Sequence, residues 1–134
     1  MASEAEVSGI GAPGRQPVVL LVEDEALLRG TTAEFLRMSG YTIIEAPTTA
    51  EAVAQLTSGQ TIDVVFSDVC LSSHLDGLAL ARWLHERRTD FPVLLTSGYG
   101  DSVRKAAVDL VGNEHFLSKP YRPEELAGRL RSLV

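Results

Sequence analysis

The sequence predicts an α/β fold in which a parallel β-sheet is covered by helices on both faces. Short apolar runs rich in β-branched residues alternate along the 134-residue chain with segments whose apolar side chains recur at helical spacing. The runs are apolar throughout, as strands are when helices cover both sides of them. Parallel neighbours also need crossover connections, which the intervening helices would supply.

Five strands and five helices are expected in strict alternation. The first strand is the run PVVLLV at 17–22, and the others are expected at 41–46, 61–68, 91–97 and 114–118. The helices are expected at 25–39, from 48 or 49 to 56, and at 77–88, 101–110 and 123–133. Gly40 is a stop signal for the first helix, and Pro123 with two glutamates after it is a start signal for the last.

Length and charge restrict the domain organisation and the partners. One domain is expected at 17–134, after a flexible tail at 1–16 that is acidic, Gly-rich and without an apolar centre. The formal net charge of -6 argues against non-specific binding to nucleic acid or to an anionic membrane. No apolar run approaches the roughly 20 residues of a membrane span, so we expect a cytoplasmic protein.

Polar residues stand at the carboxyl ends of four predicted strands. Glu23 and Asp24 follow the first strand, Asp68 ends the third, Thr96 lies at the end of the fourth, and Lys119 follows the fifth. In open parallel sheets ligands bind beyond these strand ends, at the switch in strand order. Three acids, a hydroxyl and an ammonium are therefore expected at one edge.

Such an acid cluster needs positive charge. Two carboxylates about 4 Å apart repel by roughly 4 kcal/mol at an effective dielectric of 20. Lys119 would neutralise one acid, while Asp24, Asp68 and a nearby backbone carbonyl offer the hard oxygen ligands that suit Mg²⁺ (or Mn²⁺). A carboxylate nucleophile beside a divalent cation, a hydroxyl and a lysine is suited to phosphoryl transfer.

Four motifs in order carry a family resemblance: VVLLVEDE at the first strand, VVFSD at the third with LDG opening the next helix, LLTSG at the fourth, and FLSKP at the fifth. On these motifs, residues 17–134 resemble the receiver domain of two-component response regulators, of the stand-alone or hybrid-kinase type. The resemblance implies a flavodoxin-like (βα)5 doubly wound fold with strand order 2-1-3-4-5. It also implies a phospho-accepting signalling domain, phosphorylated by a histidine kinase or a phosphotransfer protein.

The resemblance assigns roles in phosphoryl acceptance. Asp68 would be the phosphoacceptor, and Asp24, Asp68 and the backbone carbonyl of Cys70 would bind Mg²⁺. Glu23 would hold a metal-bound water. Apart from catalysing its own phosphorylation and dephosphorylation, the domain is not expected to be an enzyme.

Further roles concern the conformational switch. Thr96 would hydrogen-bond the phosphoryl group, and Lys119 would pair with it. Phe116 stands at the position of the family's switch aromatic, whose inward rotation accompanies movement of the threonine. The bond between Lys119 and Pro120 would be the family's cis peptide.

The loop after Asp68 departs from the family pattern. Ser72 and Ser73 stand where receivers usually have a proline, and Gly77 lies nine residues beyond Asp68 rather than the usual eight. The loop is thus expected to be longer by one residue and less stiff than in relatives. This difference affects the carbonyl that would bind the cation and the start of the next helix.

The output is expected to act through protein contacts. No DNA-binding output domain is expected, so the phosphorylated form would bind a downstream protein through the fourth helix, fifth strand and fifth helix. That face includes Arg104, Lys105, Tyr121 and Arg122. A monomer or weak homodimer is expected, and whether the chain is a complete protein or a module of a hybrid kinase stays open.

Two other functions compete with this interpretation. A pseudo-receiver would keep the fold as an interaction module without phosphorylation, but it would have no need of the acid cluster. A phosphatase that forms an aspartyl-phosphate intermediate, as haloacid dehalogenase-like enzymes do, would carry two aspartates in a D-x-D pattern after the first strand. Here Ala26 stands two residues after Asp24, which disfavours it.

Overall fold

The structure is a computed structural model that describes residues 15–71, 76–88, 91–98 and 100–134. The expected tail at 1–16 therefore lies outside the description except for Arg15 and Gln16. Ser72 and Ser73, which distinguish the loop after Asp68 from the family pattern, also lie outside the described residues.

Five parallel strands form one sheet, in the order β3-β2-β4-β5-β6. Numbered by position along the chain, this order is 2-1-3-4-5, so the predicted fold class and strand order are confirmed. The strands are β2 (Val18–Val22), β3 (Thr42–Ala46), β4 (Val64–Asp68), β5 (Val93–Ser97) and β6 (Phe116–Ser118). β4 occupies the centre of the sheet, and β6 is one of its edges.

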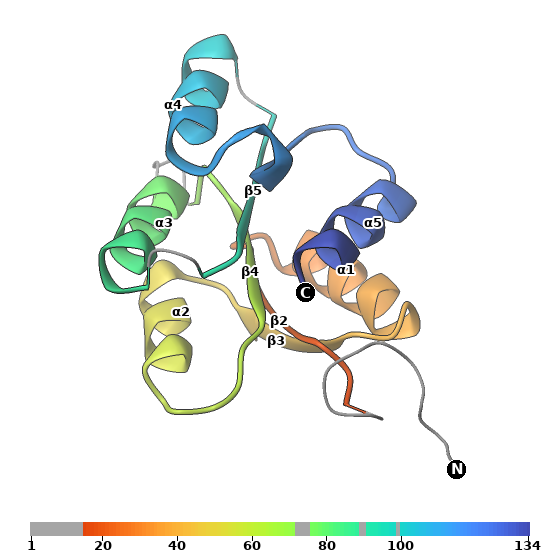
Figure 1. The fold of residues 1–134 in the computed structure, drawn as a ribbon. Helices are drawn as coiled ribbons and strands as arrows, with labels where there is room; N and C mark the ends of the chain where they lie inside the picture. The colour runs from red at the N-terminus through yellow and green to blue at the C-terminus, as the bar shows by residue number, and fades with distance from the viewer. Residues whose placement is uncertain (1–14, 72–75, 89–90, 99) are drawn as a thin grey trace.

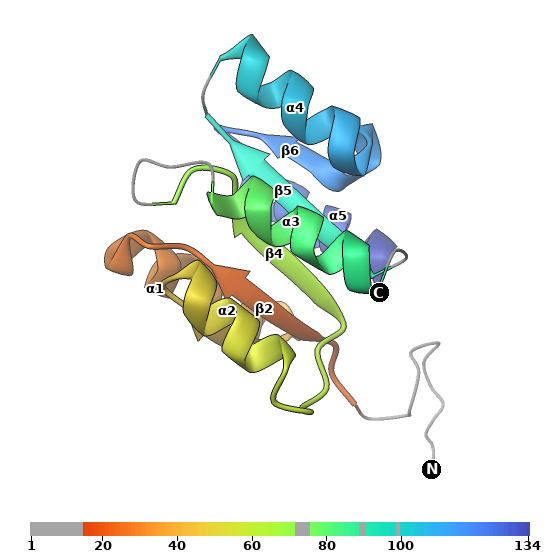
Figure 2. The same ribbon diagram turned by 90° about the vertical axis from the view of Figure 1, so that its left-hand side faces the viewer.

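The helices cover the sheet from both sides. They are α1 (Ala26–Met38), α2 (Thr49–Leu56), α3 (Asp76–Arg87), α4 (Asp101–Val111) and α5 (Pro123–Leu133). Helices α2, α3 and α4 lie on one face of the sheet and α1 and α5 on the other (Figure 1). Turning the molecule shows α2, α3 and α4 side by side in front of the strands (Figure 2).

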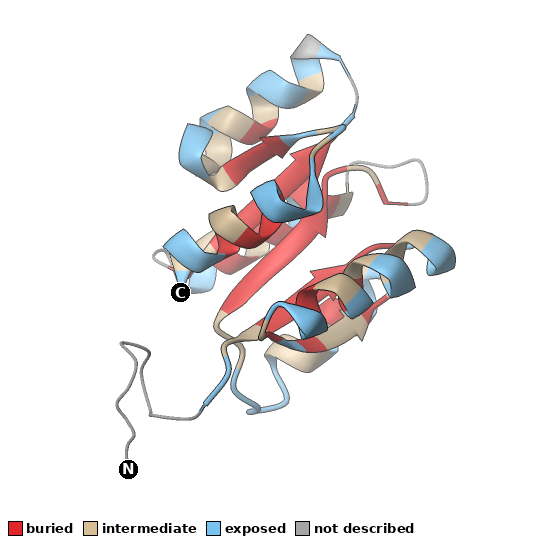
Figure 3. Ribbon diagram, turned by 90° about the vertical axis from the view of Figure 1, so that its right-hand side faces the viewer, coloured by how far each residue is buried: buried red, intermediate tan, exposed pale blue. Residues whose placement is uncertain are grey.

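The core is divided by the sheet into two apolar layers. One contains Leu20 and Val65 with residues of α2, α3 and α4, and the other contains Leu21 and Phe66 with residues of α1 and α5. The central strands are buried on both faces, while the helices expose their outer sides (Figure 3). This burial explains why the strand sequences are apolar without alternation.

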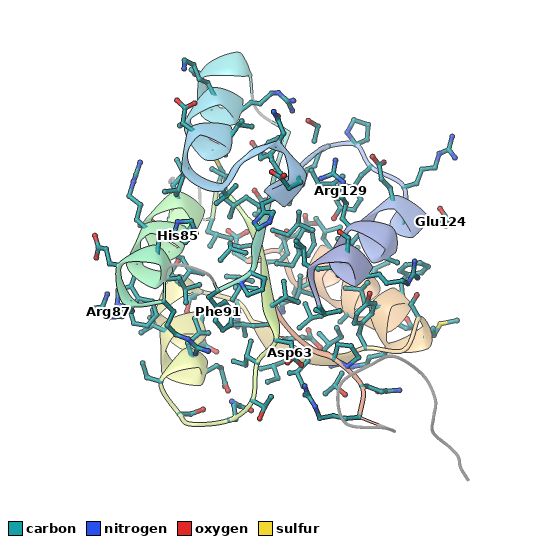
Figure 4. The ribbon with its side chains drawn as sticks, viewed as in Figure 1. Asp63, His85, Arg87, Phe91, Glu124 and Arg129 are labelled. Carbon is teal, nitrogen blue, oxygen red and sulfur yellow. The ribbon has the colours of Figure 1, made fainter. Side chains whose placement is uncertain are left out.

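The third predicted strand begins later than expected, at Val64 rather than residue 61. Asp63 instead anchors the preceding turn: its carboxylate accepts hydrogen bonds from the Val18 amide at 2.7 Å and from both terminal nitrogens of Arg15 at 3.0 Å. Figure 4 labels Asp63 at the amino-terminal end of β4. The side chain thus joins the beginnings of β2 and β4 at the end of the sheet opposite the acid cluster.

The fifth predicted strand is also shorter than expected. Asn113–His115 form a 3-10 turn, and only Phe116–Ser118 form a strand. Gly112, which precedes the turn, has a positive φ of 87° that other residues rarely adopt. The remaining elements begin and end within two residues of the predicted positions.

Candidate functional site

The carboxyl ends of the strands bring the predicted polar residues to one edge of the sheet. Asp68 is the last residue of β4, and strand register places it opposite Thr96 on β5. Thr96 in turn lies opposite Leu117 on β6, two residues before Lys119. Glu23 directly follows β2, the other neighbour of β4, so the carboxyl ends of four neighbouring strands, β2, β4, β5 and β6, supply the site.

The carboxylate of Asp68 is buried and has a partner on each oxygen. Asp68 is 8% exposed. The Lys119 ammonium donates to Oδ2 at 2.5 Å, and the backbone amide of Cys70 donates to Oδ1 at 3.0 Å. A buried carboxylate is tolerable when it is paired and hydrogen-bonded in this way. The peptide bond between Lys119 and Pro120 is cis, as predicted.

Lys119 stays charged in this environment. Partial burial acts to lower the pKa of Lys119, but the hydrogen bond and charge of Asp68, with the charges of Glu23 and Glu25, raise it above 10.5 overall. The ammonium is thus a permanent positive charge beside Asp68 at neutral pH.

Glu23 lies inside the same cluster, and its neighbours oppose its ionisation. Burial raises the pKa of Glu23 above its ordinary value, and the charges of Asp68 and Asp24 raise it further. A hydrogen bond from the Glu25 amide, 3.1 Å long, and the charge of Lys119 work in the opposite direction. Three acids and one lysine therefore leave an excess of negative charge at this edge.

This excess fits a divalent cation. Among the described residues, no three His, Cys, Asp or Glu side chains come together as a metal-binding group. The predicted ligands use only two carboxylates, from Asp24 and Asp68, with one backbone carbonyl, which suits Mg²⁺ because it keeps several waters. Asp24 is exposed while Asp68 is buried, so the cluster is open to solvent on the side of Asp24.

Gly77 lets helix α3 approach the backbone at the end of β4. Its amide donates to the carbonyl of Val69 at 2.9 Å. A Cβ at this position would lie only 2.1 Å from the carbonyl oxygen of Asp68 and 2.7 Å from Cα of Val69. Only glycine, which has no Cβ, therefore fits at this position of the LDG motif. The sequence pattern alone did not explain why the motif has a glycine.

Thr96 is adjacent to Asp68 in the sheet but its hydroxyl is engaged on the other side. Thr96 Oγ1 donates to the carbonyl of Leu117 at 2.6 Å, and both residues are buried. The predicted hydrogen bond from Thr96 to a phosphoryl group would therefore require this hydroxyl to change partner.

Phe116, at the predicted switch position, is buried at 3% exposure. The guanidinium of Arg104 on α4 lies 5.2 Å from its ring centroid, and the same side chain donates to Ser118 Oγ at 2.6 Å. From the other side, Arg129 on α5 donates to the Phe116 carbonyl at 2.7 Å (Arg129 is labelled in Figure 4). Two arginines thus fix the short strand β6 from α4 and α5.

Two residues beside the acid cluster, Arg29 and Glu45, were not predicted from the sequence. Arg29 on α1 donates from Nη1 to the carbonyl of Glu23 at 2.9 Å and from Nε to Glu45 at 3.2 Å. Glu45 lies near the end of β3, where no role was predicted. The only signal was a charged residue one turn into α1 and an acid in an otherwise apolar strand.

The sequence profile of the response regulator receiver domain matches residues 19–131. The chain belongs to this family. None of the helices in the described part of this receiver domain is long and apolar enough to cross a bilayer.

Curated relatives of this receiver domain include regulators and a kinase. It is 32% identical over 118 residues to the phosphate regulon transcriptional regulatory protein PhoB of Pseudomonas aeruginosa, covering 87% of this chain and 51% of that protein. It is 33% identical over 118 residues to the aerobic respiration control protein ArcA of Escherichia coli, covering 88% and 48%. Sensor kinase CckA of Brucella abortus is 32% identical over 117 residues, covering 87% of this chain and 12% of the kinase. The chain thus spans about half the length of the two regulators.

Solved structures agree on the fold. A response regulator receiver protein from Sinorhizobium medicae superposes with a TM-score of 0.77 at 27% identity, covering 88% of this chain and 94% of that one. The chemotaxis response regulator CheY4 of Vibrio cholerae gives a TM-score of 0.76 at 24% identity, covering 90% and 100%. The receiver fold of two-component response regulators therefore extends over nearly the whole described chain.

Proposed function

We propose that this receiver domain accepts a phosphoryl group on Asp68 and signals through the resulting rearrangement of β5 and β6. The observation that carries the proposal is the pairing of a buried Asp68 carboxylate with the Lys119 ammonium within a cluster of further acids. A structural aspartate would be satisfied by Lys119 and the Cys70 amide alone. The additional acids add electrostatic repulsion to the cluster, and a bound cation would offset that repulsion while it also binds a phosphoryl group.

Phosphoryl transfer needs few atoms to move. An oxygen of Asp68 forms a bond to phosphorus while the bond between phosphorus and the donor's histidine nitrogen breaks, and the imidazole leaves with that electron pair. Lys119 exchanges its bond to Asp68 for an oxygen of the phosphoryl group. Its raised pKa keeps it protonated for this role at neutral pH.

The acid cluster supplies the cation site. Asp24, Asp68 and the Cys70 carbonyl would hold Mg²⁺ or Mn²⁺, and Glu23 would hold a metal-bound water. When bound, the cation offsets negative charge on the phosphoryl oxygens and on the acids. The excess negative charge around Glu23 supports this assignment.

The switch would use Thr96 and Phe116. When the Thr96 hydroxyl turns from Leu117 to a phosphoryl oxygen, β6 loses a hydrogen bond to β5. The buried ring of Phe116 and the Arg104 contact outside it then lie next to the changed bond. The α4, β6 and α5 face, with Arg104, Lys105, Tyr121 and Arg122, would pass this change to a downstream protein.

The donor would be a histidine kinase or a phosphotransfer protein. A hollow of about 530 Å³, lined mainly by apolar atoms, lies between α1 and the segment after β6 and reaches Lys119. Leu28, Phe35 and Tyr121 line it. A protein that delivers a phosphoryl group to Asp68 must come close to Lys119, and this hollow supplies apolar contact area beside it. We further propose a cytoplasmic location and no enzymatic turnover of other substrates.

The test is phosphorylation of an Asp68→Asn variant. The wild-type domain, incubated with Mg²⁺ and a radiolabelled phosphohistidine protein or small phosphodonor, should gain one label that hydroxylamine removes. The variant should gain none. Asp109→Asn is the matched control, because Asp109 is exposed on α4 and pairs only with Lys105 among the described contacts. Undiminished labelling of the Asp68 variant would overturn the assignment, whereas partner binding independent of label would favour a pseudo-receiver.

A further inference from the structure

Hydrogen bonds fix the turn that carries Glu23 and Asp24 through both backbone groups of Glu23 and both of Glu25. The Glu23 amide donates to the Ala46 carbonyl at 3.1 Å. The Glu23 carbonyl accepts from Arg29 Nη1 at 2.9 Å. The Glu23 carboxylate accepts from the Glu25 amide, and the Glu25 carbonyl accepts from the Arg29 amide at 2.9 Å. Arg29 therefore bonds the turn at two points, with its side chain and its backbone.

The Arg29 side chain is itself fixed in place. Its Nε donates to Oε1 of Glu45 at 3.2 Å, and the side chain is only 18% exposed. Oε2 of Glu45 accepts from Arg37 at 3.3 Å, and Arg37 also donates to the carbonyl of Ile43. Glu45 thus lies between two arginines of α1, so the position of Arg29 is determined by β3 as well as by its own helix.

We propose that Arg29 is a positioning residue for the cation site: it fixes the Glu23 carbonyl and thereby the direction in which Asp24 meets Asp68. Arg29 donates through two separate nitrogens, Nε to Glu45 on β3 and Nη1 to the Glu23 carbonyl after β2. The planar guanidinium therefore joins the two segments in a fixed geometry, which a single-point charge such as an ammonium could not do. Residues behind a metal ligand that fix its orientation commonly change metal affinity 10–100-fold when they are removed. The inference rests on the proposed function, because it assumes that the acid cluster binds a divalent cation.

The positive charge of Arg29 and its positioning of the turn should have opposite effects on Mg²⁺ affinity, so substitutions can distinguish them. Arg29 is a positive charge close to an acid cluster, and as a charge alone it weakens cation binding. If charge were its only influence, Arg29→Met would bind Mg²⁺ more tightly and Arg29→Lys would bind as the wild type does. If Arg29 positions the turn, both variants bind more weakly, because neither retains the two donors.

The experiment compares Arg29→Met and Arg29→Lys with Arg37→Met as the matched control. Arg37 makes the second bond to Glu45, and its hydrogen bonds among the described residues go to Glu45 and Ile43 rather than to Glu23. Mg²⁺ affinity is measured by calorimetric or NMR titration of the unphosphorylated domain, and thermal melts establish that each variant is folded. Both Arg29 variants should bind Mg²⁺ about tenfold more weakly, and Arg37→Met should bind as the wild type does.

A second measurement needs no metal. Amide hydrogen exchange at Glu25, whose N–H donates to the Glu23 carboxylate, reports the order of the turn in metal-free protein. Exchange should be faster in Arg29→Met and unchanged in Arg37→Met. Unchanged exchange together with equal or tighter Mg²⁺ binding in Arg29→Met would overturn the inference. If the wild type binds no Mg²⁺ at millimolar concentration, the cation site fails instead, and Glu25 exchange still decides whether Arg29 orders the turn.

Discussion

Thr96 and Leu117 are joined by a buried hydrogen bond, 2.6 Å long, from the threonine hydroxyl to the leucine carbonyl. A hydroxyl has one proton to donate, so in this state it is committed to β6. The same hydroxyl is the predicted donor to a phosphoryl group on Asp68. If Asp68 is phosphorylated as proposed, the phosphoryl group and the Leu117 carbonyl on β6 would compete for this one proton.

Replacing Thr96 with Val should destabilise the unphosphorylated domain. The change keeps the branched shape but leaves the Leu117 carbonyl buried without its donor, which costs about 1–3 kcal/mol of unfolding free energy. Urea denaturation measures this loss. Thr96→Ser is the control, since it retains the hydroxyl and should lose less, about 0.8 kcal/mol for one methyl group. Equal stability of Thr96→Val and the wild type would refute the bond's contribution.

Replacing Gly77 with Ala should disturb the end of β4 from the side of α3. The added methyl would lie 2.1 Å from the Asp68 carbonyl, so the start of α3 must move, and overpacking of this kind costs about 1–3 kcal/mol. Phosphorylation of Asp68 should slow as well, because the backbone that carries it shifts. Rates from a small phosphodonor and urea denaturation measure the two effects.

Gly128→Ala is the matched control for Gly77→Ala. Gly128 lies within α5, and a Cβ there would meet no atom within 4 Å. Alanine is the better helix former, so this variant should gain up to about 1 kcal/mol and phosphorylate normally. If both variants behaved alike, the close approach at Gly77 would have no consequence.

Replacing Asp63 with Asn should alter how stability depends on pH. The hydrogen bond from Arg15 lowers the pKa of Asp63 below 3.8, aided by the Val18 amide and opposed by burial. A lowered pKa means that the unfolded state binds the proton more readily than the folded state. The ionised Asp63 therefore stabilises the fold above pH 3.8, and this contribution is lost as pH falls through the pKa of the folded state. Asp63→Asn should be less stable than the wild type at neutral pH, and the difference should shrink in acid.

Urea denaturation at several pH values tests the role of Asp63. Asp109→Asn is a suitable comparison, because its ion pair with Lys105 is largely exposed and should contribute little at any pH. A stability difference for Asp63→Asn that stays constant from neutral to acid pH would contradict the assignment.

The alternation of elements and the site edge were predictable because both follow from local patterns. Apolar runs identify the strands, and the carboxyl ends of parallel strands lie at one edge whatever the side chains do. Asp68 was recognisable since a carboxylate at the end of a fully buried strand needs a partner. Its partner, Lys119, was recognisable because it directly follows the fifth predicted strand, whose carboxyl end lies at the same edge.

The rest depends on contacts between distant segments. Glu45 is distinguished in the sequence only as an acid in a mainly apolar strand, and its importance arises only when α1 folds back and places Arg29 and Arg37 around it. The direction of the Thr96 hydroxyl depends on a rotamer that no pattern encodes. Asp63 was expected inside a strand because its neighbours are apolar, but its carboxylate is used by Val18 and Arg15 instead.

The hydrogen bonds from Arg104 and Arg129 to β6 limit how another chain could bind at this edge of the sheet. An open sheet edge is a template onto which another chain can add a strand, and natural proteins shorten or cover such edges. β6 offers only three residues, and Arg129 already occupies the Phe116 carbonyl. Strand addition at this edge is therefore disfavoured. If a downstream partner binds the proposed face, it would contact helix side chains, and the signal would pass as a change in surface shape and charge rather than through a shared β-sheet.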